Sequence, residues 1–272
     1  MTAMTLVIGG TGKTGRRVVR RLSALGVPTR IGSRAGEPPF DWQDRATWAP
    51  ALDGVTAAYV AYYPDLAFAG AADTVRDLAA MAVAAGVGRL VLLSGRGETG
   101  AGEAERAVRK SGAAWTVVRC SFFDQNFSEH FLLDGARGGV LAFPAGEVRE
   151  PFVDLEDVAD VATAALTDDR HAGQVYEVTG PRLLTFGEAA QEIARATRRQ
   201  VRYVPVTGEE YRTAMLAHGV PEQEADALAG LFAEVLDGRN ASLGDGVQRA
   251  LGRPPRDFAA YARDAAATGV WA

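Results

Sequence analysis

Cysteine and lysine are nearly absent from this chain of 272 residues. Its one cysteine is Cys120, so no disulfide can form within the chain. This cysteine usage is typical of a reducing compartment, and we expect a cytoplasmic protein. The only lysines are Lys13 and Lys110. Any mechanism that requires a lysine therefore has two candidates.

Several classes of protein find no support in the sequence. No apolar stretch reaches the roughly 18 residues of a membrane span. A strand-like run begins within the first five residues, which leaves no room for a signal peptide. The net charge is −5 and no basic run occurs. We therefore expect neither a membrane partner nor a nucleic-acid partner.

Metal and hydrolase chemistry are not favoured either. The three histidines, His130, His171 and His218, have no metal-ligand spacing to one another or to Cys120, so no metal site is predicted. A Ser-His-Asp hydrolase of the common α/β type would need a G-x-S-x-G elbow, and the sequence has none.

Short apolar runs alternate with helical patterns through the first two thirds of the chain. The runs that predict strands are residues 6–9, 28–33, 56–63, 89–95, 115–119 and 173–180. Strands separated by helices at this spacing imply right-handed crossovers and a parallel sheet. The expected fold class is α/β, with a doubly wound (Rossmann) sheet.

The last third reads as mostly helical. Thr185 with Glu188 and Thr207 with Glu210 both fit capping boxes at helix starts, and a last helix is predicted near Asp257. We expect residues 181–272 to form a smaller, mostly helical substrate lobe over the carboxyl edge of the sheet, where doubly wound proteins bind ligands. Residues 1–180 would form the core.

The first predicted strand leads into the sequence GGTGKTG, residues 9–15. Its Gly-Lys-Thr resembles a triphosphatase loop, but the spacing G-x-x-x-x-G-K-[ST] would place the first glycine at Val7, inside the strand. The pattern Gly9-x-x-Gly12-x-x-Gly15 instead fits a dinucleotide loop between a strand and a helix. The helix N-terminus would then meet a pyrophosphate. The alternative is a glycine-rich turn without a ligand.

The second predicted strand ends at Ser33 and Arg34, with no acidic residue before Glu37. An NAD site usually has Asp or Glu there for the ribose 2′-hydroxyl, whereas an arginine can meet a 2′-phosphate. The sequence therefore favours NADP(H) as cofactor. The alternative is that Arg34 is a solvated loop residue, and Lys13 could also reach a phosphate.

The usual proton donor of short-chain dehydrogenases, a Tyr-x-x-x-Lys pair, is absent. None of the seven tyrosines is followed by lysine four residues later. The corresponding stretch, GEAERAVRKSG at residues 102–112, contains no tyrosine.

This combination of motifs resembles the NmrA-like, atypical branch of the short-chain dehydrogenase/reductase superfamily along essentially the whole chain. The matching segments are GGTGKTG, FDWQDRATW, VLLSG, AERAVRKSGAAWTVVRCSFFDQNFSEHF, PFVDLEDVADVA and VTGPRLLTFGEAAQEIA. Within that branch the chain is most similar to the festuclavine-dehydrogenase and azo- or triphenylmethane-reductase group. Members of the branch reduce iminium ions, ketones, quinones or dyes, and some sense the dinucleotide without catalysis.

The resemblance implies the positions of the cofactor contacts. The residues expected at the pyrophosphate are Gly9, Thr11, Gly12, Lys13, Thr14 and Gly15. Ser33 and Arg34 fall at the 2′-phosphate, and Asp41 falls near the adenine. Ala61, Tyr62 and Ser94 are expected beside the nicotinamide half. Many relatives have proline where this chain has Cys120, so the resemblance does not predict the backbone conformation at this position.

Residues 121–133, SFFDQNFSEHFLL, hold four of the eleven phenylalanines. Phe123, Phe127 and Phe131 recur every four residues and would share one helical face. That face is either an aromatic wall for a bulky, apolar substrate or packing for the small lobe. Phe122 and Asn126 lie off this stripe and are better candidates for the pocket.

Two functions fit these observations. The first is an NADPH-dependent reductase acting on C=O or C=N of a bulky aromatic or polycyclic small molecule, as in tailoring steps of secondary metabolism. Its proton would come from the substrate, from water, or from Ser94, Tyr62 or Tyr63. The second is a non-catalytic NADP(H) sensor with a protein partner. The chain is expected to act as a monomer or homodimer.

Overall fold

The computed structural model describes residues 4–272, which divide into two compact units. The first unit contains residues 4–120, 155–178 and 245–253. The second contains residues 121–154, 179–244 and 254–272. This division differs from the two consecutive segments expected from the sequence, because the chain leaves the first unit after residue 120 and returns to it twice.

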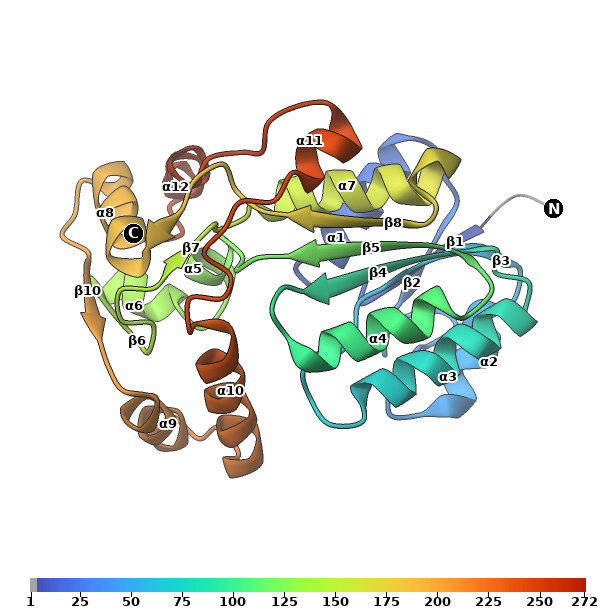
Figure 1. The fold of residues 1–272 in the computed structure, drawn as a ribbon, viewed down its shortest axis with the longest axis horizontal. Helices are drawn as coiled ribbons and strands as arrows, with labels where there is room; N and C mark the ends of the chain where they lie inside the picture. The colour runs from blue at the N-terminus through green and yellow to red at the C-terminus, as the bar shows by residue number, and fades with distance from the viewer. Residues whose placement is uncertain (1–3) are drawn as a thin grey trace. The chain divides into compact units, whose positions relative to one another are not determined.

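The first unit is built on a six-stranded sheet with strand order β2-β1-β3-β4-β5-β8 (Figure 1). Every adjacent pair is parallel. The strands are β1 (Met4–Ile8), β2 (Thr29–Gly32), β3 (Val55–Val60), β4 (Arg89–Gly95), β5 (Ala114–Cys120) and β8 (Gln174–Val178). From β1 the chain adds β2 on one side and then β3 on the other, so the strand order reverses between β1 and β3. This confirms the expected doubly wound α/β fold.

Helices cover both faces of this sheet (Figure 1). On one face α1 (Gly15–Ala24) packs on α7 (Leu155–Thr167), and α7 packs on α11 (Gly246–Leu251). On the other face α3 (Ala71–Ala84) lies between α2 (Trp48–Leu52) and α4 (Thr99–Arg109). Two 3₁₀ turns, Arg45–Thr47 and Asp169–His171, join these elements.

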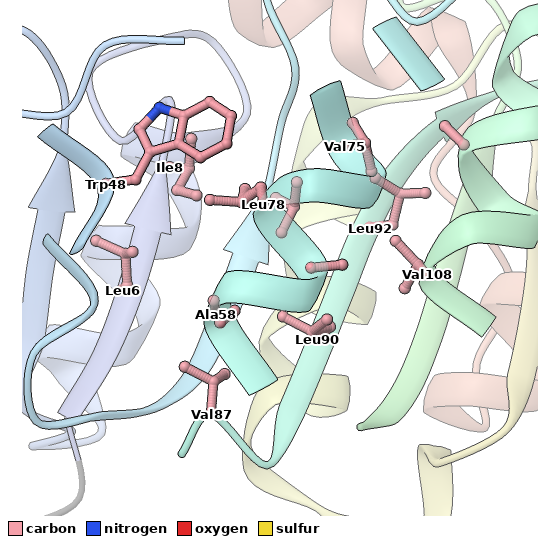
Figure 2. Packing of buried hydrophobic residues seen from close by; sticks show 14 of the residues in the cluster. Leu6, Ile8, Trp48, Ala58, Val75, Leu78, Val87, Leu90, Leu92 and Val108 are labelled. Atoms are coloured by element: carbon pink, nitrogen blue, oxygen red, sulfur yellow. The ribbon is translucent and has the colours of Figure 1, made fainter. Parts of the chain in front are cut away.

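Apolar side chains fill the layer between the sheet and the second set of helices (Figure 2). Leu90 and Leu92 of β4 pack there against helix residues such as Leu78 and Val108. All four are at most 2% exposed. Burying a side chain of this size contributes roughly 1.5–3 kcal/mol. The layer therefore fixes the sheet, and with it the strand ends that carry the site.

The second unit is mostly helical and has two small sheets. Its helices are α5 (Asn126–Glu129), α6 (Leu133–Gly138), α8 (Phe186–Thr197), α9 (Gly208–Ala217), α10 (Glu222–Val235) and α12 (Phe258–Ala267). Strand β6 (Val140–Phe143) pairs with β10 (Arg202–Pro205) in parallel. Strand β7 (Arg149–Glu150) pairs with β9 (Leu184–Thr185) in antiparallel fashion. No helix within residues 4–272 has both the length and the apolar character needed to cross a membrane.

Both capping boxes are confirmed. The Thr185 hydroxyl accepts from the Glu188 amide at 3.0 Å, and the Glu188 carboxylate accepts from the Thr185 amide at 2.8 Å. Thr207 and Glu210 make the same pair of bonds at the start of α9. Asp257 caps α12 by accepting from the Ala259 amide at 2.8 Å. Local sequence therefore fixes where these helices begin.

Candidate functional site

The loop between β1 and α1 has the geometry of a dinucleotide loop. It turns at Gly9, whose φ of +73° lies in the left-handed region that favours glycine. The Gly9 amide donates to the Gly32 carbonyl of β2 at 2.9 Å. The Gly12 amide donates back to the Gly9 carbonyl, also at 2.9 Å. The backbone is thus folded tightly at the carboxyl end of β1.

The glycines of this loop differ in what a side chain would meet. A β-carbon on Gly15 would collide with the Gly9 carbonyl, so the start of α1 approaches the loop too closely for any other residue. A β-carbon on Gly10 would lie 2.9 Å from both the Ile31 side chain and the Val7 carbonyl oxygen. The pattern used in the sequence analysis did not include Gly10, although the Gly9-Gly10 pair could have indicated it. On Gly12 the nearest atom would be the Gly9 oxygen at 3.2 Å. Gly12 is exposed, so its lack of a side chain leaves a surface that a ligand can approach.

Helix α1 begins at the end of this loop. The first N–H groups of a helix have no carbonyl partners inside it, and the helix dipole makes this end electropositive. Thr14, which precedes the helix, makes no side-chain cap bond. Thr11 is exposed and Lys13 is half-buried. The arrangement suits a phosphate group.

Ser33 and Arg34 lie in the turn that follows β2. The Ser33 carbonyl accepts from the amides of Gly36 and Phe40, both at 2.9 Å, which fixes the turn. Arg34 is exposed, and the structure assigns it no hydrogen bond or ion pair with any residue in the range 4–272. Most other arginines of the first unit are paired with acidic side chains, so Arg34 is a guanidinium that remains available to an anion.

Trp42, which sequence analysis did not single out, follows Asp41 in the chain and contacts both Ala61 and Tyr62. The Trp42 indole donates to the Ala61 carbonyl at 3.2 Å. Its ring centroid lies 4.8 Å from that of Tyr62. The Asp41 carboxylate accepts from the Gln43 amide at 3.0 Å. Strand β3 ends at Val60, so the prediction that it runs to residue 63 was wrong.

The two tyrosines that follow β3 have different surroundings. Tyr62 is half-buried and packs against the apolar layer as well as against Trp42. Tyr63 is 71% exposed. Neither phenol forms a hydrogen bond among the described residues.

Ser94 is buried at the end of β4 and donates its hydroxyl proton to Glu105 Oε1 at 2.7 Å. Glu105, on α4, also accepts from Arg119 Nε at 2.8 Å and from Arg109 at 3.1 Å. Burial raises the pKa of Glu105, but the hydrogen bonds from Arg119 and Ser94 outweigh it and leave the pKa below its usual value. The carboxylate therefore stays ionised and holds the Ser94 proton. This arrangement does not favour Ser94 as a proton donor to a ligand.

Cys120 continues β5 without a break. It pairs with Gly95 of β4 and with Val178 of β8. Its carbonyl accepts from the Arg96 amide at 3.0 Å. Burial raises the pKa of the Cys120 thiol well above its usual value. The thiol is thus a small apolar group in the sheet and not a nucleophile.

The aromatic segment does not form the predicted helix. Helix α5 covers only Asn126–Glu129, and His130 is extended. Phe123, Phe127 and Phe131 therefore do not share one helical face, and that prediction was wrong. Phe123 lies before the helix and forms an isolated bridge with Val153.

Phe127 and Phe122 belong to the aromatic core of the second unit. Phe127 is fully buried, and the Trp271 indole donates to its carbonyl at 2.7 Å. The Phe122 ring lies within 6.4 Å of several others, namely those of Phe127, Phe131, Phe143, Phe152 and Phe186. Asn126 is 7% exposed, whereas Phe131 is 37% exposed. Phe131 is thus the most accessible phenylalanine of the segment.

No group of three or more His, Cys, Asp or Glu side chains within residues 4–272 could hold a metal ion. The donors that the structure does gather at the carboxyl edge of the first unit's sheet are backbone amides and arginine. These groups bind phosphates rather than metals.

Comparisons with known proteins agree with this picture. The family model described as the NmrA-like family matches residues 102–252. The NAD(P)H azoreductase of Xenophilus azovorans is 35% identical, and the match covers 97% of this chain and 98% of that protein. The agroclavine dehydrogenase of Claviceps fusiformis is 30% identical, with coverage of 95% and 96%.

The fold has solved counterparts. The triphenylmethane reductase of Citrobacter sp., solved with NADP(H), superposes with a TM-score of 0.76. It is 20% identical, and the match covers 97% of this chain and 99% of that one. Together with the two sequence relatives, it falls in the reductase group that the motifs of this chain resemble. The chain therefore belongs to the NmrA-like family.

Proposed function

We propose that this protein is an NADPH-dependent reductase that transfers hydride to a C=O or C=N group of a bulky aromatic or polycyclic small molecule. The observation that carries the proposal is the loop of residues 9–15, in which glycine is required at the close approach to β1 and is exposed at Gly12. When bound, NADPH would supply the hydride. All other contributions must come from the chain itself.

Each part of the cofactor has a group suited to hold it. The exposed loop at Thr11 and Gly12, with the N-terminus of α1, suits the pyrophosphate. Arg34, which has no partner of its own in the described chain, suits a 2′-phosphate that NADH lacks. Asp41 would lie near the adenine of the cofactor. The Trp42–Tyr62 pair would lie beside the nicotinamide half. These assignments make the first unit the cofactor-binding unit.

The substrate class follows from the relatives and from the second unit. The relatives are named for an azo compound, a clavine and a triphenylmethane, which are large and aromatic. In the second unit Phe122, Phe123, Asn126 and Phe127 are the residues we expect near a substrate, with Phe131 added because it is exposed. Phe127 is fully buried, so it would support the neighbouring phenylalanines by packing against them.

The reaction would proceed without a dedicated protein acid. The sequence has no Tyr-x-x-x-Lys pair, and the Ser94 proton is held by Glu105. A positioned general acid contributes about 10²–10⁴-fold to a rate. An iminium substrate is already cationic and needs no proton in the transition state. Catalysis would then depend on orientation of the cofactor and exclusion of water.

The test has two stages. Calorimetry with NADPH and NADH measures cofactor binding, and we expect NADPH to bind more tightly. Loss of NADPH absorbance is then followed with azo dyes, triphenylmethane dyes, quinones, polycyclic ketones and cyclic iminium ions. With a ketone, an iminium ion or a triphenylmethane dye as substrate, deuterium from 4-deuterated NADPH should appear on the reduced carbon. Binding without turnover of any class would favour a dinucleotide-sensing protein, and absence of binding would exclude both.

A further inference from the structure

Arg17 contacts the loop that the proposed function assigns to the pyrophosphate. It lies in the first turn of α1, and its Nη1 donates to the Lys13 carbonyl at 2.8 Å. Its Nε donates to Glu156 Oε1 of α7, also at 2.8 Å. The Arg17 side chain is 11% exposed. One guanidinium therefore joins the loop to a helix more than a hundred residues away in the sequence.

The backbone hydrogen bonds at the start of α1 show how Arg17 contacts the loop. The Arg16 amide donates to the Gly12 carbonyl at 3.1 Å, and the Arg17 amide donates to the Thr14 carbonyl at 3.0 Å. The Arg17 amide thus bonds three residues back to Thr14, while the Arg17 side chain donates to the Lys13 carbonyl. The orientation of the Lys13 carbonyl is set by a guanidinium that Glu156 holds in place.

The orientation of the Lys13 carbonyl determines the orientation of the Thr14 N–H, a hydrogen-bond donor. A trans peptide is planar, so the Thr14 N–H points away from the Lys13 carbonyl oxygen. Because Arg17 binds the Lys13 carbonyl oxygen, the Thr14 N–H points in the opposite direction within the peptide plane. Thr14 immediately precedes α1, where the helix N-terminus favours an anion.

We propose that Arg17 is a positioning residue for the cofactor loop, and that Glu156 holds it so that the Thr14 N–H is oriented toward the pyrophosphate. This inference rests on the proposed function, because it assumes that a dinucleotide occupies the loop. Burial raises the pKa of Glu156, but hydrogen bonds from Arg21 and Arg17 outweigh it and lower the net value. The carboxylate that anchors Arg17 is therefore ionised at neutral pH.

The chain offers a matched control in Arg21. It is also on α1, is 18% exposed, and donates from Nη2 to Glu156 Oε2 at 2.8 Å. Its remaining bonds go to Asp160 and to backbone carbonyls of Glu156 and Arg17, and none goes to the loop. Arg17→Gln and Arg21→Gln each remove one half-buried cation and an ion pair with the Glu156 carboxylate. Only the first removes the bond to the Lys13 carbonyl.

The experiment measures binding by calorimetry for the full chain. Arg17→Gln should weaken NADPH about tenfold, while Arg21→Gln should change it less than twofold. Affinity for 2′-AMP, which has the adenine and the 2′-phosphate but no pyrophosphate, should stay within twofold in both variants. Melting temperatures should fall by similar amounts in the two variants.

Other outcomes would overturn the inference. Equal weakening of NADPH by both variants, or equal weakening of NADPH and 2′-AMP by Arg17→Gln, would make Arg17 a structural residue only. If the Arg17→Gln variant does not fold, Arg17→Lys tests the same contact. Lysine keeps the charge but cannot reach both partners at once, so NADPH should weaken about threefold, and wild-type affinity would contradict the inference. If wild-type protein does not bind NADPH at all, the proposed function itself fails.

Discussion

The glycine loop (residues 9–15) and the aromatic segment (residues 121–131) differ in what fixes their conformations. In the loop, the decisive contacts are between close neighbours in the chain, such as the Gly12 amide with the Gly9 carbonyl. In the aromatic segment, the partners of Phe127 are as distant as Phe258 and Trp271. A loop fixed by its own backbone can be specified locally, whereas an aromatic side chain is positioned by residues that its local pattern does not contain.

The first prediction tests whether Phe127 is core or pocket. Phe127→Ala should lower the free energy of unfolding by about 3–5 kcal/mol, because the ring is fully buried among Phe122, Phe152 and Phe258. Chemical denaturation measures this loss. NADPH affinity should change little, since the cofactor is assigned to the first unit.

Phe131→Ala is the matched control for this prediction. Phe131 is 37% exposed, so its truncation should cost less than half as much stability. The opposite ranking, or a Phe127→Ala variant with normal stability and lost turnover, would mean that Phe127 is a substrate contact and not a core residue.

The fold was largely predictable because periodicity and capping act over short distances. The β4 boundaries match the prediction from the run RLVLLSG, and the capping boxes at Thr185 and Thr207 start helices where expected. The two-unit division was not predictable in the same way. Helix α11 belongs to the first unit, where Gly246 approaches the backbone of Glu177 too closely for a side chain, a contact across about seventy residues.

The candidate site could be located from the sequence where residue type and spacing define it, although its contacts with a cofactor stay predictions. Glycines at positions 9, 12 and 15 and an arginine after the second strand could be assigned without coordinates. The hydrogen bond from Ser94 to Glu105 and the contact of Arg17 with the Lys13 carbonyl could not be assigned. In both cases the outcome depends on where a flexible side chain points, which is decided by packing between elements rather than by local sequence.

The next prediction separates the two kinds of glycine in the loop. Gly12→Val should weaken NADPH at least a hundredfold, because a side chain on this exposed glycine would occupy the space assigned to the pyrophosphate. Stability should fall much less than for Gly15, because the one close contact of a β-carbon, the Gly9 oxygen at 3.2 Å, requires only a small backbone shift. Calorimetry and thermal melting give the two values.

Gly15→Ala should behave in the opposite way. Its β-carbon would collide with the Gly9 carbonyl, so the melting temperature should fall before any ligand is added. If Gly12→Val binds NADPH with wild-type affinity, the loop is a glycine turn without a ligand.

A smaller effect is expected at Arg34. Charge-assisted hydrogen bonds to a phosphate contribute about 1.5–3 kcal/mol. Arg34→Ala should therefore weaken NADPH by roughly ten- to a hundredfold and leave NADH within twofold. Because Arg34 is exposed and has no partner in the described chain, stability should not change. A wild-type protein that prefers NADH would contradict the assignment before any variant is made.

The smallest effect is expected at the tyrosines after β3. Tyr62→Phe and Tyr63→Phe should each keep turnover within about tenfold of wild type, below the usual loss for a general acid. Neither phenol has a lysine four residues later, and the Tyr62 ring packs against Trp42 with centroids 4.8 Å apart. Phenylalanine keeps this packing, whereas Tyr62→Ala should cost more because the ring itself is lost. Steady-state kinetics with NADPH at saturation measures the change. A thousandfold fall in kcat for either phenylalanine variant, with NADPH affinity unchanged, would identify that phenol as the proton donor and exclude acid-free reduction.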